Sequence, residues 1–396
     1  MNVTIILSGG QTVTAAFPMN DIQLSDMADR LRGNPEFDFR ISEFENLELP
    51  MNLCGKYYKG DLKRLNLFAE RLEKLDNMGE AQMTALTDHF LNADLDDLIQ
   101  MTYGLDSVPT WPCNRENEMT EIAFTNGWLP ELENCPYEVI DLLDGQKVCE
   151  RVSTERSGTI INGYYIEPAE YVCQNVQPEY KEPSQVFFRL LLAAPDRNGG
   201  YNYGSARWLS LPCPEIYLND FEEEMGAEFE KMCVVDRQSS LPNLSPYQIG
   251  TEKIYELNEL ANTMKRLPHS EIMKLKAVMQ LENISIISDT KAAIRHLTEY
   301  DFDTYLHDES EFGRKYLAMQ LPTNFDFRLL NEADMHVLGR NILQTKGGDV
   351  TDYGVVSGRG QVLYSVVSQE PEQSVSEECE DDESESESEG LGVCLT

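Results

Sequence analysis

Carboxylates are the side chains through which this sequence could do chemistry, because aspartate and glutamate number 69 against 32 lysines and arginines. Glu43 and Glu45 alternate along a predicted strand and therefore share one face. Glu70 and Glu73 lie three residues apart on a predicted helix, where such residues are surface neighbours. The other clusters contain Asp94, Asp96, Asp97, Glu222, Glu223, Glu224, Glu228, Glu230, Asp301, Asp303, Asp308, Glu309 and Glu311. One cluster alone is typical of a solvated face, but their recurrence on ordered elements indicates a surface that attracts basic proteins.

No pattern in the sequence predicts a catalytic, cofactor or metal site. Residues 301–312 begin like a calcium loop, but Leu306 stands where glycine is needed and Phe312 where glutamate is needed. Ser8-Gly9-Gly10 lacks the Lys-Ser or Lys-Thr pair of a phosphate loop. The five histidines match no zinc-binding pattern: His89, His269, His296, His307 and His336. Because no nucleophile, base and orienting group come together, we predict that the chain is not an enzyme and needs no cofactor.

The charge balance excludes several classes of partner. The net charge is −37, and residues 1–368 alone hold 58 acidic and 32 basic residues, a balance of −26. Direct binding of nucleic acid needs lysines and arginines, and anionic membranes attract basic segments, so we expect neither partner. Duplex DNA carries one charge per ~1.7 Å of its axis, so the body of the chain has the charge of roughly 44 Å of duplex.

Cysteine usage and the ends of the chain predict a reduced, cytoplasmic protein. The nine cysteines are an odd number and form no CxxC pair. The first residues, MNVTIILSGG, lack the basic region of a signal peptide, and no stretch approaches the ~18 apolar residues of a membrane span. Residues 369–396 contain eleven acidic residues and no lysine or arginine, a composition that predicts a disordered tail.

The elements that must position the carboxylates follow one order twice, which predicts an α+β fold. In the first half we expect strands at 3–7 and 12–17, a helix at 21–31, a strand at 38–44, helices at 61–75, 80–90, 95–103, 118–124 and 137–143, and a strand at 159–166. In the second half we expect strands at 186–194 and 207–211, a helix at 215–225, a strand at 232–236, helices at 253–267, 271–282, 290–297, 313–319 and 331–343, and strands at 350–356 and 361–367. The predictions for both halves are based on apolar residues at helical or alternating spacing.

Two residue matches share one shift and support a tandem duplication. Leu65-Asn66-Leu67-Phe68-Ala69 matches Leu257-Asn258-Glu259-Leu260-Ala261, and Leu129-Pro130 matches Leu321-Pro322, both at a shift of 192 residues. A period of this length exceeds that of solenoid repeats, ~20–50 residues, and indicates two copies of a domain set. We therefore expect a first module at 1–183, a second at 184–368 and the acidic tail at 369–396.

The second half contains a block that resembles the ArdA-type antirestriction proteins, which are DNA mimics carried by mobile elements. The block comprises residues 321–327 (LPTNFDF), 339–341 (GRN) and 348–354 (GDVTDYG), preceded by helices with a Leu-Asn-x-Leu-Ala core. The first half matches less closely, with Gly145-Gln146 where a Gly-Arg pair is expected. The block adds three carboxylates to the expected mimic surface: Asp326, Asp349 and Asp352.

The resemblance implies an elongated, curved acidic rod of small α+β and helical subdomains. It also implies that the chain occupies the DNA-binding groove of type I restriction-modification enzymes, or a related defence complex, in the cytoplasm of a bacterial host. Family members pair as homodimers, whereas two linked copies in one chain favour a monomer with pseudo-twofold symmetry. We expect the two C-terminal regions, near 129–166 and 321–367, to form its central contact. An acidic scaffold or chaperone for another basic nucleic-acid-binding protein remains the alternative function.

Overall fold

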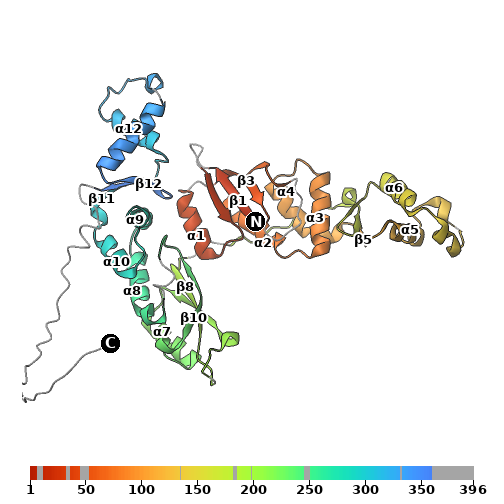
Figure 1. The fold of residues 1–396 in the computed structure, drawn as a ribbon, viewed down its shortest axis with the longest axis horizontal. Helices are drawn as coiled ribbons and strands as arrows, with labels where there is room; N and C mark the ends of the chain where they lie inside the picture. The colour runs from red at the N-terminus through yellow and green to blue at the C-terminus, as the bar shows by residue number, and fades with distance from the viewer. Residues whose placement is uncertain are drawn as a thin grey trace, which may run out of the picture.

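The chain folds into small antiparallel sheets and short helices that alternate along its length (Figure 1), so the expected α+β class is confirmed. The computed structural model describes residues 1–6, 12–32, 36–44, 53–133, 135–181, 185–197, 199–244, 250–330 and 332–358. The expected strand at 361–367 and the tail at 369–396 lie outside these residues. Among the described helices, none combines the length and apolar character needed to cross a membrane.

The first half begins with a sheet in the order β2-β1-β3-β4, backed by helices. Its strands are β1 (Asn2–Ile6), β2 (Thr12–Ala16), β3 (Phe37–Glu43) and β4 (Tyr57–Gly60), and its helices are α1 (Asp21–Arg30), α2 (Leu62–Leu72), α3 (Asn77–His89) and α4 (Leu95–Tyr103). Alternate residues of β3, namely Phe37, Phe39 and Ile41, are buried in the same core as the apolar stripe of α2. The predicted strands and helices of this region are therefore confirmed, and β4 is an addition.

A separate lobe completes the first half and has its own core around Tyr165. It contains β5 (Thr110–Pro112), α5 (Glu116–Thr125), α6 (Gly145–Arg156), β6 (Thr159–Ile161) and β7 (Tyr164–Ile166), in the sheet order β5-β7-β6. The predicted helix at 137–143 is a 3-10 helix, Tyr137–Leu142. The predicted single strand at 159–166 is wrong, because the chain reverses at Asn162 and Gly163, which both have positive φ. Glycine adopts that conformation without steric cost.

Apart from β4, which has no counterpart among the described residues, the second half repeats the same succession of elements. It contains β8 (Phe188–Ala193), β9 (Arg207–Leu211), α7 (Glu215–Met225), β10 (Cys233–Ser239), α8 (Ile254–Lys265), α9 (His269–Leu281), α10 (Ile287–Arg295), β11 (Tyr300–Asp303), α11 (Glu309–Ala318), α12 (Glu332–Thr345), β12 (Asp349–Thr351) and β13 (Gly354–Gly358). The sheets have the orders β10-β8-β9 and β11-β13-β12. The predicted strand at 350–356 is wrong, because this segment is the hairpin β12–β13, and β11 occupies part of the segment that begins like a calcium loop.

Without the additional β4, the two halves have the same sheet topologies, with the order β2-β1-β3 matching β9-β8-β10 and β5-β7-β6 matching β11-β13-β12. A buried asparagine occupies the same place in each. Met19 N donates to Asn66 Oδ1 (2.6 Å), and Asn66 Nδ2 donates to Met19 O (3.3 Å). Cys213 N donates to Asn258 Oδ1 (2.9 Å), and Asn258 Nδ2 donates to Cys213 O (3.0 Å). Each side chain thus satisfies the backbone of the loop that leads from the second strand into the following helix.

Gly339 of the second-half block and Gly313, which precedes the block, serve helix packing. A Cβ on Gly339 would lie 1.7 Å from the carbonyl oxygen of Glu309, and one on Gly313 would lie 2.6 Å from that of Met335, so both let α11 and α12 approach closely. Gly145 begins α6, whereas Gly339 lies in the middle of α12. The alignment of Gly145-Gln146 with the Gly-Arg pair is therefore wrong.

The halves are elongated arms that meet in a T-shaped outline (Figure 1). The end of the first arm at α1 abuts the middle of the second arm, beside α9 and β12, while α5 and α6 lie at the far end. The expected central contact between 129–166 and 321–367 is wrong, because the contact joins α1 to α9 and the β12–β13 turn, which are not equivalent elements. A head-to-tail contact of this kind does not give the expected twofold relation.

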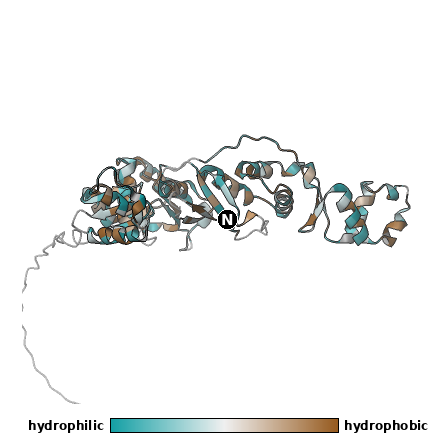
Figure 2. Ribbon diagram, turned by 90° about the horizontal axis from the view of Figure 1, so that it is seen from above, coloured by the Kyte–Doolittle hydropathy of each residue, from teal (hydrophilic) through white to brown (hydrophobic). Residues whose placement is uncertain are grey.

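The helices of both arms carry hydrophilic and hydrophobic residues together, as the hydropathy colouring of Figure 2 shows and as amphipathic elements do.

Candidate functional site

Most of the predicted carboxylates lie on helices and strands or next to their ends, and most of them are exposed. The exposed ones are Glu43, Glu73, Asp94, Asp96, Asp97, Glu223, Glu224, Glu228, Glu230, Asp301, Asp326, Asp349 and Asp352. The half-buried ones are Glu70, Glu222, Asp303, Asp308, Glu309 and Glu311, and Glu45 lies outside the described residues. The clusters on α4, on α7 and around β11 and α11 belong to different lobes of the T (Figure 1). The surface is therefore a set of separated acidic patches.

Part of this set holds the fold together. Asp94 and Asp97 form a capping box at the start of α4, in which Asp97 N donates to Asp94 Oδ1 (2.9 Å). Asp308 caps α11 by accepting from Glu311 N (2.8 Å). Glu222 Oε1 accepts from Phe229 N (2.6 Å). Carboxylates at helix N-termini compensate unpaired N–H groups and the helix dipole, so these residues have a structural role that spacing alone did not show.

Other predicted carboxylates form ion pairs within the chain. Asp96 lies 2.9 Å from Arg64, Glu228 lies 2.8 Å from Lys231, and Asp326 lies 2.8 Å from Arg328. Further pairs join Glu224 to Arg207, Asp303 to Lys315, Glu309 to Arg340 and Glu70 to Lys181. Exposed pairs contribute about 0–1 kcal/mol each. A partner that offers a better cation can therefore open them at little cost.

Hydrogen bonding keeps two of these carboxylates ionised. The side-chain hydrogen bond from Lys231 lowers the pKa of Glu228. The side-chain hydrogen bond from Arg328, followed by the backbone N–H of the same residue, lowers the pKa of Asp326. Both groups therefore stay ionised to a lower pH than a carboxyl group without such a partner.

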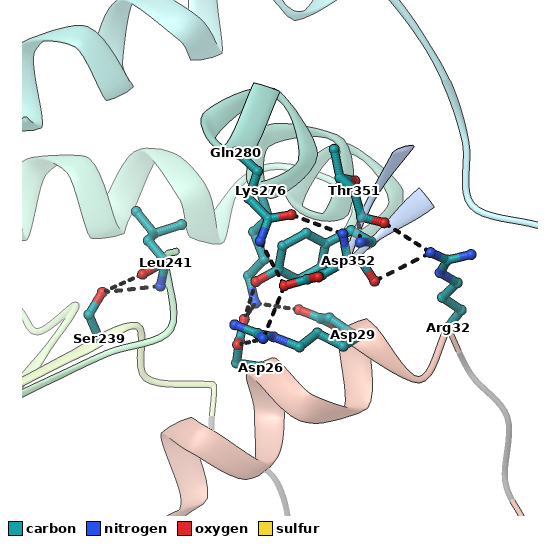
Figure 3. Close-up of polar contacts among 11 residues, drawn as sticks. Asp26, Asp29, Arg32, Ser239, Leu241, Lys276, Gln280, Thr351 and Asp352 are labelled. Carbon is teal, nitrogen blue, oxygen red and sulfur yellow. Dashed lines mark hydrogen bonds and ion pairs between the residues drawn. The ribbon is translucent and has the colours of Figure 1, made fainter. Parts of the chain in front are cut away.

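The contact between the arms contains acids that the sequence did not single out (Figure 3). Lys276 of α9 places Nζ 2.8 Å from Asp26 Oδ1 and 2.6 Å from Asp29 Oδ2, and its side chain is 1% exposed. Arg189 of β8 binds Asp21 with both terminal nitrogens, at 2.5 and 2.7 Å. Such bidentate pairs fix orientation as well as contributing energy. Lys276 follows Leu275 and precedes Ala277 and Val278, and a lysine inside an apolar run was the available signal for a buried pair.

The β12–β13 turn completes this contact. Arg30 NH1 lies 3.1 Å from Asp352 Oδ2, and Gln280 Nε2 donates to the same oxygen (2.8 Å). Tyr353 donates its hydroxyl to Asp26 Oδ1 (2.8 Å), and its burial raises its pKa. Arg32 donates to the carbonyl oxygens of Leu306 (2.7 Å) and Thr351 (3.0 Å). Asp352, expected as a phosphate stand-in, thus serves the joint between the arms.

The structure also bears on small-molecule chemistry. A cavity of about 660 Å³ lies between the end of α3 and the start of α4, lined by His89, Phe90, Asp97, Tyr171 and Cys173 among others. In the described ranges, no three His, Cys, Asp or Glu side chains group as metal ligands would. Compared with known protein families and with curated protein sequences, this sequence finds no match.

Proposed function

We propose that this chain is a DNA mimic of the ArdA type, which occupies the DNA-binding groove of a type I restriction-modification enzyme or a related defence complex. The observation that carries the proposal is the display of exposed carboxylates on helices and strands of both arms, in a body with a balance of −26. Carboxylates on fixed elements keep their spacing, so a groove built for phosphates can meet them without first ordering them. The resemblance of residues 321–354 to the family supplies the class of target.

The same proposal includes the origin and state of the chain. Equal sheet topologies and the matched Asn66 and Asn258 support a tandem duplication of one module. We infer a monomer in the cytoplasm of a bacterial host, because the ion pairs between the arms already join the two modules. Light scattering tests this: a mass near 45.1 kDa is expected, and twice that value would contradict a monomer.

A competition assay tests the function. A type I methyltransferase complex is loaded with a fluorescent duplex and titrated with this protein. We expect displacement of the duplex, and an affinity that falls steeply as salt rises, as ionic binding requires. An affinity that is equal at low and moderate salt would contradict mimicry. Retention of another basic protein that duplex cannot displace would favour the acidic scaffold instead.

Matched variants separate a positioned surface from bulk charge. The triple change Glu43→Gln, Glu73→Gln and Glu230→Gln removes three exposed carboxylates from ordered elements. The control changes Glu385, Glu387 and Glu389 of the tail to glutamine, an equal loss of charge. We expect the first variant to compete less well than the control. Equal loss in both would show that net charge alone acts.

A further inference from the structure

Helices α1 and α7 are equivalent elements of the two arms, and their sequences align without gaps. Each follows the second strand of its sheet, and a shift of 194 residues aligns Asp21–Arg30 with Glu215 to Glu224. The core-facing positions agree, because Leu24 and Met27 of α1 and Leu218 and Phe221 of α7 are all buried. The opposite stripes also agree in chemistry. They are Ile22, Asp26 and Asp29 on α1, and Ile216, Asp220 and Glu223 on α7.

The stripe of α1 is occupied, and the stripe of α7 is open. On α1, Ile22 is fully buried and the two aspartates hold Lys276 between them. On α7, Ile216 is 70% exposed, and both acids are exposed. Within the part of the chain that the structure describes, neither Asp220 nor Glu223 has an ion-pair partner. The same apolar-acid-acid pattern is therefore used once inside the molecule and presented once on its surface.

We propose that α7 docks onto the target protein as α1 docks onto the second arm. Ile216 packs against an apolar contact surface, and a lysine or arginine of the target enters between Asp220 and Glu223. This inference rests on the proposed function, and it assigns one helix as the anchor within the acidic surface. An apolar anchor matters because an exposed ion pair alone contributes little, whereas a desolvated pair beside a buried side chain gives the large energies of interface hot spots.

Charge complementarity selects a foreign basic protein over a second copy of this chain. The site that receives α1 is covered within the same chain. Its counterpart in the first arm is α3, where a shift of 192 places Thr84 for Lys276 and Asp88 for Gln280. If α7 docked onto α3 of a second copy, its acids would find no lysine at position 84 and an additional carboxylate at Asp88, which is unfavourable. A surface rich in lysine and arginine, such as a DNA-binding groove, fits the exposed stripe of α7.

The competition assay with the type I methyltransferase complex and labelled duplex also tests this inference. Two variants address the two halves of the stripe: Ile216→Ala, and Asp220→Asn combined with Glu223→Gln. The charge-matched control is Glu133→Gln with Glu138→Gln, two exposed acids of the first arm. We expect both α7 variants to weaken competition by about tenfold or more, as truncated anchors do, and the control by no more than about threefold, as rim charges do.

The salt dependence distinguishes the two parts of the anchor. Ile216→Ala should weaken binding without changing the slope of affinity against salt, whereas the double acid variant should reduce that slope. Equal behaviour of the α7 variants and the control would overturn the docking inference and leave DNA mimicry in place. A wild-type protein that fails to displace the duplex would overturn both. All changed positions are exposed, and circular dichroism checks that each variant folds.

Discussion

Replacing Lys276 by methionine should weaken the joint between the arms more than any change on the surface. The lysine side chain is 1% exposed and Asp29 is 7% exposed, so the substitution leaves a buried carboxylate with only the exposed His269, whose Nε2 lies 3.2 Å from Asp29 Oδ1. Removing one partner of a buried pair costs about 3–5 kcal/mol. Asp26 retains Arg30 at 2.9 Å and the Tyr353 hydroxyl at 2.8 Å. We therefore expect a loss near the lower end, about 3 kcal/mol.

A double-mutant cycle isolates the coupling energy between Lys276 and Asp29. Asp29→Asn removes the orphaned charge, so Lys276→Met combined with Asp29→Asn should lose less stability than the sum of the two single changes. Lys265→Met is the control, because this lysine is exposed on α8, and surface changes stay within about 0.5 kcal/mol. Urea unfolding followed by circular dichroism measures the free energies, and small-angle scattering measures whether the arms separate.

The expected result has two parts. Lys276→Met should lower the free energy of unfolding or increase the radius of gyration, because the arms either unfold or part when the contact fails. The coupling with Asp29 should be at least about 0.5 kcal/mol, as contacting residues show. A Lys276 variant that matches the Lys265 control in both measurements, with additive effects at Asp29, would refute the role assigned to this joint.

Three further predictions concern other parts of the chain. Asn66→Ala and Asn258→Ala should each lower stability by about 1–3 kcal/mol in urea unfolding, because each leaves a backbone donor and acceptor unpaired; a negligible effect at either position would contradict the structural role assigned to that asparagine. Burial, and then the nearby Arg32, lower the pKa of His307 in the folded protein. The contribution of neutral His307 to stability is therefore complete above the ordinary histidine pKa of about 6.5 and is lost as the pH falls below that value. His307→Gln should make the free energy of unfolding depend less on pH in this range. Deleting residues 369–396 should leave both folding and duplex competition intact, and a truncated protein that folds but does not compete would assign activity to the tail.

Apolar spacing predicted most helices, and it failed where few apolar residues anchor an element. The predicted helix at 215–225 has the bounds of α7. In contrast, α6 escaped prediction because Val148 and Val152 are its only large buried side chains, too few for a visible stripe. The hairpin at 159–166 was missed for another reason. Asn162-Gly163 is a strong turn signal, but apolar residues on both sides gave the appearance of one continuous strand.

Exposure of the carboxylates followed from the sequence, whereas their partners did not. Helix faces are local properties, so the exposed positions of α4 and α7 could be predicted from spacing alone. Ion pairs such as Asp96 with Arg64 and Asp29 with Lys276 join residues from different elements, which only the tertiary arrangement brings together. This is also why the contact between the arms was placed wrongly. Acids that bind within the chain and acids that face outward have the same appearance in sequence.

The joint between the arms and the proposed contact between α7 and the target should respond differently to salt. Both use carboxylates, but Lys276 and Asp29 are almost fully buried, whereas the acids of α7 are exposed. At about 0.15 M ionic strength the screening length is about 8 Å in solvent, and buried pairs are screened much less than exposed ones. Rising salt should therefore release the target before the arms move apart. The arrangement allows an acidic molecule to keep a fixed shape while its affinity for a basic partner varies with ionic conditions.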